Sequence, residues 1–99
     1  MDISIQYVKM PVSETLTEYT ENKLQKLGKK YDWIINADIY FKIDKDPAKV
    51  DKICEIELSL PGPRIFASSK EKNFELAVKG TISDLEKQLK KRKATFHPY

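Results

Sequence analysis

The sequence has few of the residues on which catalysis and covalent cross-linking depend. Its 99 residues include one cysteine, one histidine and three isolated glycines, at positions 28, 62 and 80. A single cysteine cannot form a disulfide within the chain. His97, near the C-terminus, is the only histidine, so a Ser-His or Cys-His pair has no well-placed base. Isolated glycines do not form a phosphate-binding loop. These shortages predict that the protein is not an enzyme.

Long hydrophobic runs and metal-ligand clusters are also missing. No apolar run approaches the ~20 residues that a membrane-spanning helix needs, and the first residues show no signal-peptide pattern. Asp44 and Asp46 fall in a predicted turn, and two carboxylates there are weak evidence for a cation site. We therefore expect no metal, no cofactor and no membrane contact. The single cysteine favours a reducing, cytoplasmic location.

Regular hydrophobic periodicity predicts the fold of a single domain. Alternating apolar and polar residues predict four strands, near residues 3–7, 37–43, 54–60 and 64–68. Apolar residues at helical spacing predict two helices, over about residues 14–30 and 74–93. The order is β-α-β-β-β-α, and it predicts an α+β fold, a four-stranded sheet with two helices on one face. We expect one domain over residues 1–99, with a frayed tail at 94–99.

Three local features support these boundaries, and a fourth, Gly80, needs a reason of its own. Ser13 and Asn73 precede the predicted helices and have the side chains that cap helix N-termini. Residues 44–47, Asp-Lys-Asp-Pro, are typical of a turn. Gly80 lies inside the second helix, where glycine costs about 1 kcal/mol relative to alanine. Close packing against a neighbouring element is the reason we expect for it.

Three residues define the predicted core. Leu24 and Leu85 lie at the centres of the apolar stripes of the two helices, so we expect both to be buried against the sheet. Cys54 alternates in phase with the apolar residues of the third strand. We therefore expect a buried, protonated and unreactive thiol rather than a nucleophile.

Charge is distributed unevenly along the chain. The net charge is only +3, yet residues 32–60 carry −3 and residues 70–93 carry +4. Basic side chains on the exposed flanks of the two predicted helices are the candidate RNA-binding residues: Lys23, Lys26, Lys30, Lys79, Lys87, Lys90, Lys91 and Arg92. The alternative is that these lysines are only the solvated ends of helices, where cations favour the negative pole of the helix dipole.

A basic helix face has two functional interpretations. Lysines present compact charges that suit phosphates better than base edges, which favours an RNA binder that reads backbone and shape. The α-β-β-β-α part of the order resembles the double-stranded RNA-binding domain, which lacks the first strand. The alternative function is a protein-interaction module whose basic helix face binds an acidic partner.

Four segments together resemble a known family, the ribosome hibernation-promoting factors, also described as ribosome-associated inhibitors or sigma 54 modulation proteins. The similarity covers about residues 2–93. It is strongest at residues 12–16 (VSETL), 23–27 (KLQKL), 67–68 (AS) and 85–91 (LEKQLKK). The last segment matches the basic L-x-[RK]-Q-L-x-K pattern of the family, and the sequence looks like the short type of member.

The resemblance implies a function at the ribosome. Members share the β-α-β-β-β-α fold and bind the small ribosomal subunit in the channel for messenger and transfer RNA, at the A and P sites. They block translation in stationary phase or stress. The match assigns contacts with ribosomal RNA phosphates to Lys23, Lys26, Lys87 and Lys91. We expect no DNA specificity and a monomer when the protein is off the ribosome.

The second helix departs from the family pattern at three places. Residues 73–75 read Asn-Phe-Glu where members usually have Asp-Met-Tyr. Lys79 stands where an acidic residue is common, and Asp84 stands where lysine is common. We therefore expect the contacts near Glu75, Lys79 and Asp84 to differ from those of other members.

Overall fold

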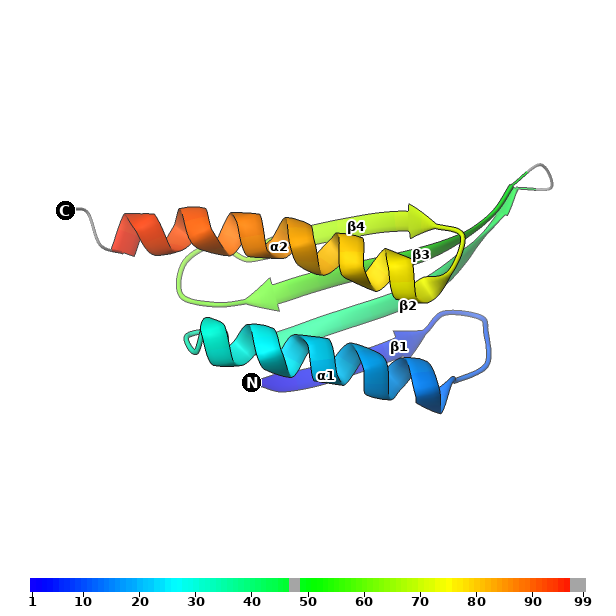
Figure 1. Ribbon diagram of the computed structural model, residues 1–99, viewed down its shortest axis with the longest axis horizontal. Helices are drawn as coiled ribbons and strands as arrows, with labels where there is room; N and C mark the ends of the chain where they lie inside the picture. The colour runs from blue at the N-terminus through cyan, green and yellow to red at the C-terminus, as the bar shows by residue number, and fades with distance from the viewer. Residues whose placement is uncertain (47–48, 97–99) are drawn as a thin grey trace.

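The computed structural model describes residues 1–46 and 49–96 as one sheet covered by two helices (Figure 1). The elements follow in the predicted order: β1 (Asp2–Tyr7), α1 (Glu14–Lys30), β2 (Asn36–Asp46), β3 (Lys49–Ser59), β4 (Ile65–Glu71) and α2 (Phe74–Phe96). The predicted fold class is therefore confirmed. No helix in the described part of the chain is long and apolar enough to cross a membrane.

The sheet has the strand order β1-β2-β3-β4. β1 pairs in parallel with β2, Ile3 facing Ala37, and the other two pairs are antiparallel. A parallel pair needs a crossover connection, and α1 supplies it. Because β1 and β4 run in the same direction, α1 and α2 also run in the same direction, side by side on one face (Figure 1). The β2–β3 hairpin extends past the helices (Figure 1).

The core lies between the helix layer and the sheet. Leu24 of α1 and Leu85 of α2 are fully buried, as predicted, and so is Cys54 of β3. The ring of Phe41, at the centre of β2, lies 5.3 Å from the ring of Phe74 at the start of α2. These contacts anchor both helices to the sheet, so their outer sides are held in fixed positions.

The predicted helix caps are confirmed. The Ser13 hydroxyl accepts a hydrogen bond from the backbone N–H of Leu16, 3.2 Å away, and the Asn73 side-chain oxygen accepts one from Leu76 N–H at 2.9 Å. The close packing expected at Gly80 is also confirmed. A Cβ atom at Gly80 would lie 3.0 Å from the hydroxyl oxygen of Ser69 in β4. The glycine therefore lets α2 approach the sheet.

Two predicted boundaries are wrong. Asp44 and Asp46 do not form a turn but belong to β2, opposite Asp51 and Lys49 of β3. The backbone pairing of a long hairpin overrides their turn propensity, and residues 47–48 lie outside the described residues. The predicted frayed tail is helical as far as Phe96, because residues 91–96 contain neither proline nor glycine to end the helix. Residues 97–99 lie outside the described residues.

Candidate nucleic-acid interface

The eight predicted basic residues all lie in the helix layer. Lys23, Lys26 and Lys30 belong to α1, and the other five belong to α2. Both helices pack on the same face of the sheet (Figure 1), so all eight residues belong to the layer on that side. They fall into two groups, one in the groove between the helices and one on the far side of α2.

The first group lies in a groove between the two helices, here called the interhelix groove. It has a volume of about 260 Å³ and is lined by Lys23, Lys26, Leu27 and Lys30 of α1 and by Ile82 and Glu86 of α2. The lysines face α2 because steps of three or four residues return to the same side of a helix. The apolar side chains of Leu27 and Ile82 line the groove together with the three lysines.

Glu86 forms an ion pair across the interhelix groove with Lys30. The hydrogen bond to Glu86 raises the pKa of Lys30 above its ordinary value, and the same bond lowers the pKa of Glu86. The Lys30 ammonium also lies 5.8 Å from the centre of the Tyr31 ring. Sequence reasoning missed Glu86 because its partner is 56 residues away along the chain.

Tyr19 extends the lysine side of α1 toward the start of the helix. It lies four residues before Lys23, whose ammonium is 5.5 Å from the centre of the Tyr19 ring. The Tyr19 hydroxyl is buried and has no hydrogen-bond partner within residues 1–46 and 49–96. The ring therefore supports the Lys23 side chain at the rim of the interhelix groove, a role that the sequence did not indicate.

The α2 side of the interhelix groove carries further positive charge. Lys79 and Lys90 lie seven residues before and four residues after Glu86, so the three side chains share one side of the helix. The helices run in the same direction and Lys30 meets Glu86. Lys79 therefore lies two turns before Glu86 on the same side of α2.

The second group lies on the side of α2 above β4. Lys91 and Arg92 line a hollow of about 270 Å³ together with Ile65, Gln88 and Thr95. Arg92 donates a hydrogen bond to the carbonyl oxygen of Pro61 at 3.1 Å, in the turn after β3. Lys87 is exposed on the outer side of α2. Arg92 therefore makes a structural contact within the fold, and its role in RNA binding stays a prediction.

The face of the sheet opposite the helices, here called the open face, has the opposite charge. Among the side chains that the structure describes, alternation along the strands places six carboxylates on it against three basic groups. The carboxylates are those of Asp2, Asp38, Asp44, Asp51, Glu55 and Glu57. The basic groups each form an ion pair there: Lys42 with Glu55 at 2.8 Å, Arg64 with Glu57 at 2.9 Å and Lys70 with Asp44 at 3.3 Å. Positive and negative charge are thus separated by the sheet.

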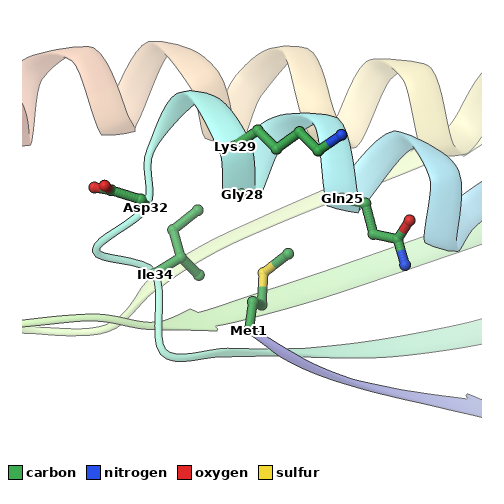
Figure 2. A pocket seen from close by; sticks show the side chains of 6 residues that line it. All are labelled: Met1, Gln25, Gly28, Lys29, Asp32 and Ile34. Carbon is green, nitrogen blue, oxygen red and sulfur yellow. The ribbon is translucent and has the colours of Figure 1, made fainter.

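A third hollow lies below the end of α1, away from the basic groups already described. It measures about 430 Å³ and is lined by Met1, Gln25, Gly28, Lys29, Asp32 and Ile34. Figure 2 shows the Met1 side chain reaching from the start of β1 toward α1. A Cβ atom at Gly28 would lie 2.9 Å from the Met1 methyl carbon. The glycine therefore makes room for Met1, and the hollow is a packing feature of this corner.

Metal and thiol chemistry find little support in the described part of the chain. Within residues 1–46 and 49–96, no three His, Cys, Asp or Glu side chains lie close enough together to hold a metal ion. Burial raises the pKa of the Cys54 thiol from an ordinary value of 9.0 to about 12. The thiol is therefore protonated at neutral pH, as its place in β3 predicts.

The family predicted from the sequence is confirmed by comparison with known proteins. The family model described as sigma 54 modulation protein / S30EA ribosomal protein matches residues 3–96. The chain therefore belongs to this family. Two relatives named ribosome hibernation promoting factor, from Pseudomonas putida and Azotobacter vinelandii, are 28% and 24% identical over 93 residues. These residues are 94% of this chain and 87% and 83% of the relatives.

Solved structures show the same architecture. A ribosomal subunit interface protein from Coxiella burnetii matches with a TM-score of 0.86 and 33% identity, over 95% of this chain and 99% of that one. The N-terminal domain of Protein Y from Thermus thermophilus matches with a TM-score of 0.78 and 21% identity, over 92% of this chain and 98% of that domain. At 21% identity, the match to the Protein Y domain shows a shared fold and nothing more.

Proposed function

We propose that the protein is a ribosome-associated hibernation factor. In this role it binds the small subunit in the channel for messenger and transfer RNA, at the A and P sites. Occupation of the channel blocks translation in stationary phase or stress, without catalysis and without a cofactor. The protein is cytoplasmic in this proposal and monomeric when it is off the ribosome. Membership of the family and the names of its relatives support the proposal.

The observation that carries the proposal is the separation of charge by the sheet. Lysines dominate the helix layer, whereas carboxylates outnumber basic groups on the open face. Near a polyanion such as ribosomal RNA, the helix layer is attracted and the open face is repelled. The helices therefore face the RNA. Lysine ammonium groups suit backbone phosphates better than base edges, so in this proposal shape and charge select the site and no DNA sequence is specified.

Co-sedimentation with separated ribosomal subunits tests the proposal. The wild-type protein is expected to travel with small subunits and to be released by a messenger RNA that fills the channel, because both occupy the same space. Sedimentation with large subunits alone would contradict the site. If an acidic protein competes for the helix layer and RNA does not, the alternative function, a protein-interaction module, replaces the proposal.

A further inference from the structure

The interhelix groove already contains an anion that belongs to the protein itself. Of the six residues that line it, three are lysines and one is a glutamate. The Glu86 carboxylate lies against the Lys30 ammonium. Lys90, one turn further along α2, also lowers the pKa of Glu86 by its charge. A carboxylate held between basic side chains marks the place where this groove stabilises negative charge.

We infer that the interhelix groove is a binding site for one backbone phosphate of RNA, and that the Glu86 carboxylate occupies this site until the phosphate replaces it. The inference rests on the proposed function for the identity of the nucleic acid. In the free protein, Glu86 neutralises Lys30. In the complex, the phosphate accepts the hydrogen bond from Lys30, and the Glu86 side chain turns away toward solvent.

The composition of the groove favours a phosphate as the ligand. Lys23, Lys26 and Lys30 are compact donors on flexible stems, which suit a tetrahedral group with several acceptor oxygens. Leu27 and Ile82 supply apolar contacts beside the lysines. Three lysines and one carboxylate line the groove, so its lining has a net positive charge. A phosphate relieves the repulsion between the lysines that Glu86 does not neutralise.

The inference gives Glu86 a definite effect on affinity. A carboxylate that competes for Lys30 weakens RNA binding, because the ion pair must break before the phosphate contact forms. Its removal leaves Lys30 free to meet the phosphate with no ion pair to break. We therefore expect Glu86→Gln to bind small subunits about fivefold more tightly at low salt.

A double-mutant cycle tests this coupling. The variants are Glu86→Gln, Lys30→Gln and the combination, measured on small subunits over a range of salt concentrations. Asp38→Asn is the matched control, since it adds the same unit of charge on the open face. The gain from Glu86→Gln should exceed that of Asp38→Asn in the wild-type background. In the Lys30→Gln background it should fall to the value of the control. An equal gain in affinity in both backgrounds would show that Glu86 acts only through long-range charge repulsion, and it would overturn the inference.

A second probe separates the inference from the proposed function. Inorganic tripolyphosphate is titrated against the full chain while backbone amide shifts of Lys23, Lys30 and Glu86 are followed by NMR. Saturable shifts that reach saturation at lower tripolyphosphate concentration in Glu86→Gln support the groove site. If the protein shows these shifts but does not bind small subunits, only the proposed function is wrong. If these amides do not respond while small subunits bind normally, the phosphate site lies elsewhere and the inference is wrong.

Discussion

Arg92 and Pro61 connect the C-terminal part of α2 to the turn between β3 and β4. The guanidinium of Arg92 donates to the Pro61 carbonyl oxygen at 3.1 Å, and one of its nitrogens lies 3.0 Å from where a Cβ atom of Gly62 would stand. Gly62 has a φ of 92°, a conformation that favours glycine. The arginine therefore covers a turn that leaves no room for a side chain at its centre.

Arg92→Gln should lower the free energy of unfolding by about 0.5–1 kcal/mol, because the Pro61 carbonyl loses a charged donor. Arg92→Lys keeps the charge but loses the planar guanidinium, so it should lose similar stability. Urea denaturation measures both, with the exposed Lys93→Gln as control. Only Arg92→Gln should also reduce affinity for small subunits. Full stability in both variants would show that the contact with Pro61 is dispensable.

Leu24→Ala and Leu85→Ala should each destabilise the fold by about 2–5 kcal/mol. Both side chains are fully buried between a helix and the sheet, so truncation leaves a cavity that the surrounding core fills only partly. The midpoint of urea unfolding reports the change. Leu76→Ala in α2, where the side chain is 45% exposed, serves as control and should shift stability by less than about 0.5 kcal/mol. An unmoved midpoint in either core variant would refute the assigned packing.

Cys54 should make stability fall at alkaline pH. The unfolded thiol loses its proton near its ordinary pKa of 9.0, whereas burial raises the pKa in the folded state to about 12. Between these values the unfolded state binds fewer protons than the folded state, so the free energy of unfolding decreases as pH rises. The slope from this one group approaches about 1.4 kcal/mol per pH unit.

Urea unfolding at pH 8 and pH 10.5 measures this effect, and Cys54→Ala should reduce the alkaline loss of stability. The native wild-type protein should also resist thiol reagents at neutral pH until it is unfolded, since the side chain is fully buried. Rapid labelling of the folded protein, or the same alkaline loss in Cys54→Ala, would contradict a buried, protonated thiol.

Lys87 and Lys91 should contribute to the salt dependence of ribosome binding. Lys87→Gln/Lys91→Gln removes two positive charges from the exposed outer side of α2. Each lost phosphate contact should flatten the slope of log K against log salt by roughly 0.7–0.9, or about 1.4–1.8 for the pair. Fold stability should change by less than about 0.5 kcal/mol for each exposed residue.

The matched control for this pair is Lys42→Gln/Lys70→Gln, which removes the same charge from the open face. Its salt slope should equal that of the wild-type protein, because the proposed orientation turns the open face away from the RNA. If the two double variants have the same slope, net charge alone governs binding and the orientation proposed for the protein is wrong.

The fold was predictable because the capping residues and the hydrophobic periodicity indicate the same helices and strands. Ser13 and Asn73 mark the helix starts, and the alternation through Ala37, Ile39 and Phe41 marks the central strand. The length of the β2–β3 hairpin was not predictable, because Asp44 and Asp46 have turn propensity and only pairing with β3 makes them strand residues.

The candidate interface was predictable only in part. Periodicity along a single helix identified the exposed lysines. It could not identify Glu86, whose effect depends on a contact with Lys30 on another helix. Nor could it reveal that Arg92 reaches a turn 31 residues earlier in the chain. Contacts between elements that are distant in the sequence leave no periodic pattern.

The separation of charge across the sheet gives the molecule an electric dipole moment perpendicular to the sheet. In the field of a large polyanion, a dipole experiences a torque before any contact is made. If the protein binds RNA as proposed, it approaches already turned with its helices forward, and fewer encounters occur in an unproductive orientation. Electrostatic guidance of this kind raises association rates at low ionic strength and fades as salt shortens the Debye length to about 8 Å at physiological concentration.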